Sequence, residues 1–193
     1  MTNPAFQHTH YLVRKKIFKL LGDAFHIYDS MGSVLFYSKL KAFKLKEDIR
    51  LYTGEDMRSE VVSIRARSIL DFSTAYDVVD SQTGELTGTL KRKGLKSLIR
   101  DSWIIMDAQG RDVGTIEEDS TALALIRRFL LNILPQSFTG TVNGQVVFQI
   151  RRHFNPFVLR MELDFSPDTQ GLLDRRLGIA AGILLSAVEG RQE

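Results

Sequence analysis

Residues 172 to 188 read LLDRRLGIAAGILLSAV, and this stretch decides the fold. After its two arginines, leucine and isoleucine alternate only with small residues, so a helix built from it is slim and apolar on all sides. The uninterrupted apolar run, 177 to 188, has 12 residues and would be about 18 Å long as a helix. A bilayer core requires about 20 residues. We therefore expect this helix in a protein interior and not across a membrane.

The rest of the chain repeats one pattern five times: an alternating apolar run, a turn that contains glycine, and a second alternating run. The turns fall at residues 29 to 32, 53 to 54, 80 to 84, 107 to 110 and 143 to 144. Asp opens such turns because its carboxylate accepts a local backbone N–H, and Gly closes them because it tolerates positive φ. Asn143-Gly144 between alternating runs is a strong hairpin signal. The pattern predicts five antiparallel hairpins.

Ten strands follow from the hairpins, and residues 11 to 18 and 157 to 165 add two more. The closing glycines are spaced too irregularly for a solenoid with a fixed period. Twelve antiparallel strands favour closure, because a barrel removes exposed edges, and a barrel this wide needs something inside it. We therefore predict a mainly β protein with some α: a twelve-stranded antiparallel β-barrel that encloses the C-terminal hydrophobic helix.

A second helix is indicated near residues 120 to 134. Ser120 is a suitable N-cap, the acidic residues 117 to 119 precede it, and Pro135 would end it. We expect this helix to cover an end or a side of the barrel. The chain is read as a flexible N-terminal tail at 1 to 10, a single domain at 11 to 188, and a C-terminal tail at 189 to 193.

Composition narrows the function classes. With 44% hydrophobic and 25% charged residues, the 193-residue chain is typical of a globular protein. It has no cysteine, which excludes disulfides, thiolate nucleophiles and palmitoyl anchors. The polar N-terminus is unlike a signal peptide, so we expect a cytoplasmic protein, peripheral at a membrane if it meets one. The net charge of +3 is uneven, because residues 1 to 50 sum to +5 and residues 51 to 90 to −4. This favours a basic and an acidic face over a nucleic-acid binder.

Several segments carry a resemblance to a known family: YLVRKK at 11 to 16, FHIYDSMG at 25 to 32, the strand with Lys39 and Lys41, and YDVVD at 76 to 80. Together with the Asn-Gly hairpin and the apolar C-terminal helix, they make residues 11 to 188 resemble the LURP-one-related proteins of the Tubby C-terminal-like superfamily. The resemblance implies a twelve-stranded barrel around a buried helix. Tubby-like members bind phosphoinositide headgroups, and scramblase-like members associate with membranes. This chain lacks the Pro-rich extension and the acylated Cys of scramblases.

The leading candidate site is the segment 91 to 100, KRKGLKSLIR, which contains no acid and five cations: Lys91, Arg92, Lys93, Lys96 and Arg100. Cations near an anionic membrane contribute about 1 kcal/mol each, and they also bind phosphate groups. The alternative is a solvated strand end and loop. A second basic stripe alternates with apolar residues, and its members are Lys39, Lys41, Lys44 and Lys46. Such a stripe is typical of an outward strand face, where lysines also protect against edge pairing.

Motifs for metals and catalysis are missing from the sequence. Asp164, Asp168 and Asp174 precede the C-terminal helix, where scramblases are thought to hold calcium, but they lack the spacing of a calcium loop. We assign them turn and cap roles. His8 and His10 fall in the N-terminal tail, and His26 and His153 are isolated on strands, so none forms a helical zinc pair. The sequence holds no nucleophile elbow, phosphate loop or dinucleotide fingerprint. We expect no cofactor, no metal and no enzymatic activity.

These observations lead to one functional prediction and one alternative. We predict a non-enzymatic β-barrel that binds an anionic partner through residues 91 to 100, with a phospholipid or phosphoinositide headgroup at a membrane surface as the leading partner. The alternative is a protein–protein interaction scaffold, without lipid binding, whose basic and acidic faces dock a partner chain or a second copy. We expect neither a nucleic-acid partner nor a transmembrane span.

Overall fold

The structure, a computed structural model, describes residues 3 to 18, 22 to 40, 48 to 67, 75 to 93, 102 to 119, 136 to 153 and 158 to 189. Within these ranges lie twelve strands, one turn of 3₁₀ helix and one α-helix. The helix expected at residues 120 to 134 and the tail residues after 189 lie outside the described residues.

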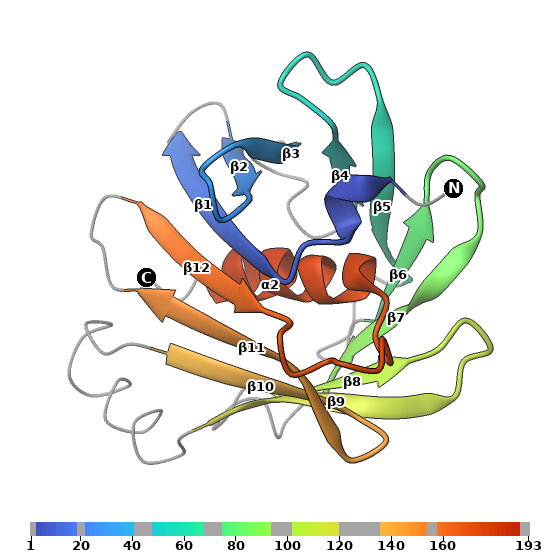
Figure 1. Cartoon of the computed structure of the whole chain (residues 1–193). Coiled ribbons are helices and arrows are strands. Elements are labelled where there is room, and N and C mark those ends of the chain that lie inside the picture. The colour runs from blue at the N-terminus through green and yellow to red at the C-terminus, as the bar shows by residue number, and fades with distance from the viewer. Residues whose placement is uncertain are drawn as a thin grey trace.

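The strands form a single closed sheet in which each strand pairs antiparallel with the next and β1 pairs with β12 (Figure 1). This confirms the predicted twelve-stranded antiparallel barrel. The strands are β1 (His10–Phe18), β2 (Gly22–Tyr28), β3 (Val34–Leu40), β4 (Asp48–Tyr52), β5 (Glu60–Ala66), β6 (Ala75–Asp80), β7 (Leu86–Arg92), β8 (Ser102–Met106), β9 (Asp112–Glu118), β10 (Gln136–Val142), β11 (Gln145–His153) and β12 (Leu159–Asp164).

Strand alternation decides which residues line the barrel. In β1, Tyr11 and Val13 are buried and point inward, while the residues between them face the outer wall. The barrel closes firmly, because β1 and β12 are paired over six positions. The junction of β3 and β4 is much shorter, with the single register pair Tyr37–Tyr52.

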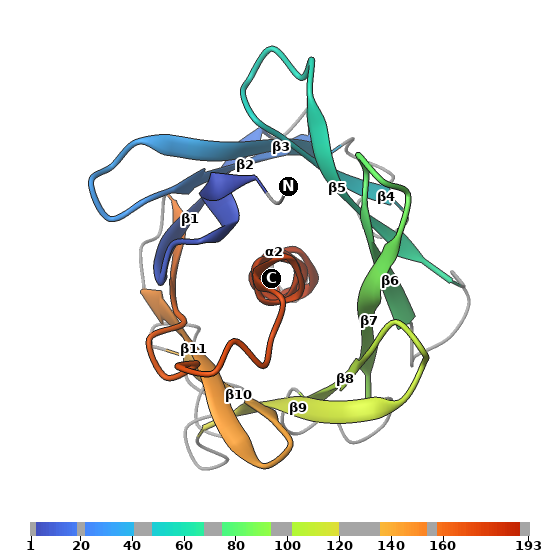
Figure 2. The ribbon, with the colours of Figure 1, turned by 45° about the vertical axis from the view of Figure 1, so that its right-hand side comes forward.

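Helix α2 (Arg175–Glu189) runs along the middle of the ring of strands, as the view down the barrel in Figure 2 shows. Its apolar residues are buried on every side, including Ile179 and Ile183. Gly178 lies against the ring of Phe165, and Gly182 lies against the side chain of Leu163. Small residues therefore let a helix fit where a bulkier one would collide with the wall. The predicted interior position of the helix is confirmed.

The helix begins at Arg175, three residues after Leu172, where the segment that predicted it starts. Asp174 acts as its cap, because its carboxylate accepts the backbone N–H of Arg176 at 2.9 Å. The preceding residues are held in turns by Asp168, whose carboxylate accepts the N–H groups of Leu172 and Leu173. Residues 165 to 174 therefore form turns that lead into the capped helix, because aspartate side chains accept nearby backbone N–H groups.

All five predicted hairpins form, and their turns lie at the same end of the barrel (Figure 1). Four closing glycines have positive φ: Gly32, Gly84, Gly110 and Gly144. The second hairpin differs, because there Met57 takes the left-handed conformation with φ 52° while Gly54 does not. The connection between β4 and β5 is a seven-residue loop, residues 53 to 59, and not a tight turn at 53 to 54.

The N-terminus also differs from the predicted flexible tail. Residues 4 to 6 form a 3₁₀ turn, η1 (Pro4–Phe6), and β1 begins at His10. Phe6 is buried and stacks on Phe36 with ring centroids 4.6 Å apart. The hydroxyl of Tyr11 donates to the carbonyl of Ala5 at 3.0 Å, and burial raises the pKa of Tyr11 to about 12. An aromatic residue five positions before the first predicted strand supplies enough apolar surface to hold this segment.

Candidate functional site

The hairpin-turn end of the barrel is acidic. The described loops at this end contain two arginines, Arg58 and Arg111, and a larger set of carboxylates, which are Asp29, Glu55, Asp56, Glu85, Asp107, Asp168 and Asp174. Several of these carboxylates accept local backbone N–H groups, as Asp29 does from Met31 and Ser33. Turn chemistry therefore concentrates negative charge at one end of the molecule.

The opposite end, which we call the basic end, is where the odd-numbered strands finish. Five of the six strands that run toward this end carry Lys or Arg within their last four residues, and the exception, β9, finishes with Glu117 and Glu118. The cations are Lys15 on β1, Lys39 on β3, Arg65 and Arg67 at β5, Lys91, Arg92 and Lys93 at β7, and Arg151 and Arg152 on β11. Asp23, Asp48, Asp77 and Asp119 lie at the same end, and Asp77 pairs with Arg67 at 2.8 Å. The cations still outnumber the carboxylates there, so the two ends of the barrel differ in charge.

The structure splits the predicted segment 91 to 100. Lys91 is exposed on the outer wall, whereas Arg92 is half-buried and pairs in register with the buried Trp103. Strand alternation therefore turns Arg92 toward the barrel interior. Lys93 is half-buried, with its Nζ 3.8 Å from a carboxylate oxygen of Glu117. Lys96 and Arg100 lie outside the described residues.

Of the second predicted basic stripe, the structure describes one residue, Lys39. Lys39 is exposed on β3, where it pairs in register with Ala24 of β2. It faces the outer wall at the basic end, as predicted for an outward strand face. Lys41, Lys44 and Lys46 lie outside the described residues.

Cations inside the barrel at the basic end were not predicted. Lys15 is 3% exposed, and its Nζ lies 5.8 Å from the centre of the Phe25 ring. On β11, Arg152 donates from Nη1 to the Oε1 of Gln136 at 3.4 Å. The signal was present in the sequence, since Tyr11, Val13 and Lys15 alternate with period two and so share a face.

These interior cations suit the direction of the helix. Gly182 lies beside Leu163 and Ser186 beside Met161, so α2 runs antiparallel to β12 and away from the hairpin turns. Its C-terminal carbonyls therefore point toward the basic end. The C-terminal end of a helix carries partial negative charge, which nearby cations stabilise.

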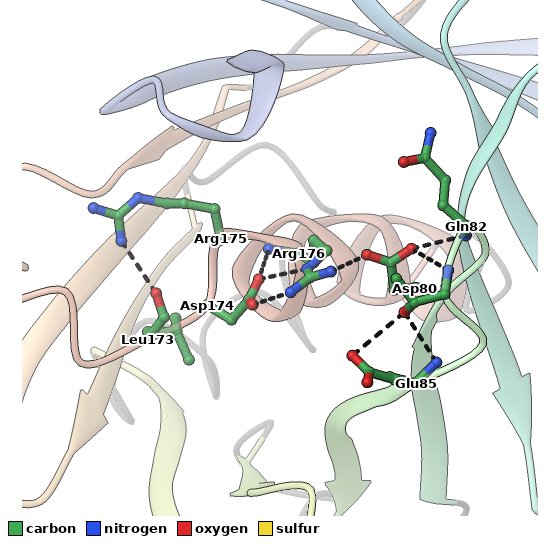
Figure 3. A network of polar contacts seen from close by, with 8 residues as sticks. Asp80, Gln82, Glu85, Leu173, Asp174, Arg175 and Arg176 are labelled. Atoms are coloured by element: carbon green, nitrogen blue, oxygen red, sulfur yellow. Dashed lines mark hydrogen bonds and ion pairs between the residues drawn. The ribbon is translucent and has the colours of Figure 1, made fainter. Parts of the chain in front are cut away.

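A network of ion pairs holds the other end of the helix (Figure 3). The guanidinium of Arg176 lies between Asp174, which caps the helix, and Asp80, at the end of β6. Asp80 in turn accepts the backbone N–H of Gln82 at 2.8 Å in the turn between β6 and β7. The side chain of Arg176 therefore ties the N-terminus of α2 to a hairpin of the wall.

Arg175 makes a second tie beside the first. Its Nη1 donates to the Oδ2 of Asp168 at 2.7 Å, and its guanidinium lies 4.7 Å from the centre of the Phe165 ring. Burial by itself would raise the pKa of Asp168, but hydrogen bonds from Arg175 and from two backbone N–H groups outweigh it, so that pKa is lowered. Asp164, Asp168 and Asp174 thus have the turn and cap roles that we assigned to them.

Within the described residues, no three His, Asp or Glu side chains come together as metal ligands. The histidines on the wall instead approach single carboxylates: His10 lies 3.2 Å from Asp164, and His26 lies 2.6 Å from Glu55. Of the helices in the described ranges, none is long and apolar enough to span a membrane.

No family model matches the chain, and no curated protein sequence matches it. Among solved structures, it is similar to an X-ray structure of a protein from Arabidopsis thaliana, with a TM-score of 0.55 and 16% sequence identity. The superposition covers 97% of this chain and 96% of that one. At this identity the likeness shows a shared fold over almost the whole chain.

Proposed function

We propose that the protein is a non-enzymatic β-barrel that binds anionic phospholipid headgroups at a membrane surface through its basic end. The observation that supports this is the charge difference between the two ends of the barrel. Membership of the LURP-one-related proteins in the Tubby C-terminal-like superfamily belongs to the same proposal. It is supported by the closed barrel around a C-terminal helix, which the resemblance implied.

The energetics favour an end-on orientation. Each cation near an anionic membrane contributes about 1 kcal/mol, and Lys39 and Lys91 are exposed at the basic end. A strand of seven residues, such as β7, is about 23 Å long, which is well over twice the Debye length of about 8 Å at physiological salt. The acidic turns therefore feel little repulsion from a membrane that touches the opposite end.

Vesicle co-sedimentation tests the proposal. We expect binding to vesicles of phosphatidylserine mixed with phosphatidylcholine, no binding to phosphatidylcholine alone, and a steep loss between about 50 and 300 mM salt as screening increases. The charge-reversed variant K39E/K91E/K96E should bind at least about tenfold more weakly, since each lost cation is worth about 1 kcal/mol.

The matched control lies at the acidic end. Arg58 has an 87% exposed side chain in the loop between β4 and β5, so R58E changes charge equally per residue but away from the proposed surface. The proposal is wrong if the triple variant binds vesicles as well as the parent does. It is also wrong if R58E weakens vesicle binding as much as each substitution in the triple variant does. Salt-sensitive self-association without any vesicle binding would instead support the scaffold alternative, with the basic end of one copy on the acidic end of another.

A further inference from the structure

The strands of the barrel wall are joined unevenly. Within the described ranges, eleven of the twelve strand junctions hold between four and seven register pairs, whereas β3 and β4 share the single pair Tyr37–Tyr52. A continued antiparallel ladder would next pair Ser38 with Leu51, but the two residues are not paired. Tyr52 ends β4 at the hairpin turns, so the unpaired part of this junction lies toward the basic end.

The unpaired stretch covers the interior of the barrel. Phe36 and Ser38 of β3 are 0% exposed, and Ile49 and Leu51 of β4 are 1% exposed. Strand alternation places all four side chains on the inner face. The hydroxyl of Ser38 has no hydrogen-bond partner among the described residues. Core side chains thus lie at this junction behind a very short ladder, and proteins open locally where few backbone hydrogen bonds oppose it.

A side-chain contact crosses the same junction on the outer wall. Glu55, in the loop that follows β4, places its Oε1 2.6 Å from the Nε2 of His26 on β2. Because β3 lies between β2 and β4, this contact passes over β3. The ring of Tyr37 on β3 lies beside His26 with ring centroids 5.0 Å apart. Burial raises the pKa of Tyr37, and the negative charge of Glu55 raises it further. The contact therefore connects β2 to the end of β4 independently of the short ladder.

The two partners of this contact differ in freedom. The side chain of His26 is 5% exposed, and its Nδ1 is buried without a partner, so the neutral ring carries its hydrogen on Nε2 and donates it to Glu55. Arg14 lies in register beside His26 and opposite Arg160 of β12, with its guanidinium 5.0 Å from the centre of the Tyr28 ring. Glu55 is 69% exposed. The contact can therefore break by movement of Glu55 alone, while His26 stays in the wall.

We propose that the barrel opens locally at the β3–β4 junction, starting from the basic end, and that the contact between Glu55 and His26 limits this opening. In the open form β3 and β4 separate while the other eleven junctions stay paired. The opening needs no lipid, and all its tests are made without vesicles, so their failure would leave the lipid proposal untouched.

Thiol labelling measures the opening, because the chain has no cysteine of its own. Ser38→Cys places a thiol on the inner face behind the junction, and Ser186→Cys places one on α2, where Ser186 is also 0% exposed. We expect a maleimide to label the thiol at 38 at least about tenfold faster than the thiol at 186, since local opening is more frequent than global unfolding. Equal labelling rates at the two positions would overturn the proposal.

The role of Glu55 is tested in the Ser38→Cys background. We expect Glu55→Ala to speed labelling at 38 at least about fivefold, because it removes the contact that limits opening. Glu162→Ala is the matched control: Glu162 lies 3.0 Å from His153 on the outer wall, across the β11–β12 junction with its five register pairs. It should leave the labelling rate unchanged. If both variants have the same effect, Glu55 does not limit the opening.

A disulfide provides a second measurement that does not depend on labelling. Tyr37 and Tyr52 are directly opposed, and opposed strand residues lie within reach of a disulfide. In the double variant Tyr37→Cys/Tyr52→Cys, oxidation should slow hydrogen exchange in β3 and β4 several-fold relative to the reduced form and leave β12 unchanged. Exchange in β3 and β4 that is the same in both forms would contradict opening at this junction.

Discussion

At the scale of single residues, two glycines of α2 meet the wall at different distances. A Cβ on Gly178 would lie 2.2 Å from the ring of Phe165, whereas one on Gly182 would lie 3.0 Å from a terminal methyl group of Leu163. The ring of Phe165 is fully buried and covered by Arg175. A methyl group at the end of a leucine can shift by a few tenths of an ångström, but a packed ring has much less freedom. Glycine is therefore necessary at 178 and less so at 182.

We expect Gly178→Ala to lower the free energy of unfolding by about 1–3 kcal/mol through overpacking, although alanine favours a helix over glycine by about 1 kcal/mol. Gly182→Ala is the matched control and should be within about 1 kcal/mol of the parent or more stable. Urea denaturation followed by circular dichroism gives both values. Equal stability of the two variants would contradict the packing at Phe165.

A second residue-scale prediction concerns Asp168, whose side chain is 0% exposed and paired with Arg175. Its pKa is lower in the folded protein than in the unfolded chain. Stability from this group is therefore fully present above the unfolded pKa and is lost as pH falls through the folded one. We expect Asp168→Asn to cost about 3 kcal/mol at pH 7, because it leaves a guanidinium without its charge partner.

Denaturation curves at several pH values check this. The gap in stability between Asp168→Asn and the parent should narrow as pH falls from about 5 toward 3, since the parent carboxylate becomes protonated. Asp56→Asn is a suitable control, because that carboxylate lies in an exposed loop at the same end, with 56% of its side chain exposed. A gap for Asp168→Asn that is constant with pH would show that the carboxylate contributes through shape and not through charge.

At the scale of elements, β7 shows how one strand can divide a run of cations. Successive side chains point to opposite faces of a sheet, so Lys91 and Arg92 cannot both belong to an outer patch. A run of charges in a sequence overstates the patch that a strand can present. The exposed cations of the basic end come instead from several strands, as Lys39 on β3 and Lys91 on β7 illustrate.

This division predicts different outcomes for neighbouring charge reversals. We expect Lys91→Glu to change the free energy of unfolding by less than about 0.5 kcal/mol and to weaken vesicle binding. We expect Arg92→Glu to cost more than about 2 kcal/mol in stability, because its side chain faces the interior beside Trp103. Thermal unfolding and co-sedimentation, measured on both variants, separate the two effects. Equal stability of both would mean that Arg92 is not directed inward.

The elements themselves were predictable where local chemistry determines them. Alternation and Asp, Asn and Gly residues located all five hairpins, because each turn is specified within a few residues. The loop between β4 and β5 was misread, since Gly54 suggested a tight turn while Met57 takes the left-handed conformation. Phe6 was also missed, because a single aromatic residue gives no periodic pattern from which packing on Phe36 could be inferred.

At the scale of the whole molecule, long-range register is what the sequence does not reveal. The closed barrel followed from the number of strands and the need to fill the interior. The opposition of Arg14 and Arg160, however, depends on how β1 and β12 align across almost the full chain. The tie between Arg176 and Asp80 likewise spans 96 positions. The opposition of Arg14 and Arg160 and the helix tie were therefore beyond prediction, although every residue in them is visible in the sequence.

The ties at Arg175 and Arg176 bear on whether the helix leaves the barrel when the protein meets a membrane. Release would break both ion-pair ties and expose an apolar interior that is buried on every side. A lipid surface at the basic end lies at the opposite end of the helix, so its headgroups cannot replace the ion pairs that release would break. We therefore expect the backbone amides of α2 to stay protected from hydrogen exchange when the protein is bound to phosphatidylserine vesicles.

Hydrogen exchange by mass spectrometry, with and without vesicles, measures this directly. Protection should increase at peptides that contain the strand ends near Lys39 and Lys91, and should be unchanged at the hairpin turns and across α2. Asp80→Asn removes one charge partner of Arg176 and should speed exchange at the start of the helix equally with and without vesicles. This variant therefore shows how large an increase in exchange a loosened helix start produces. If vesicles speed hydrogen exchange across α2 in the parent protein, the helix leaves the barrel on binding. It would then occupy the barrel interior only in the unbound protein.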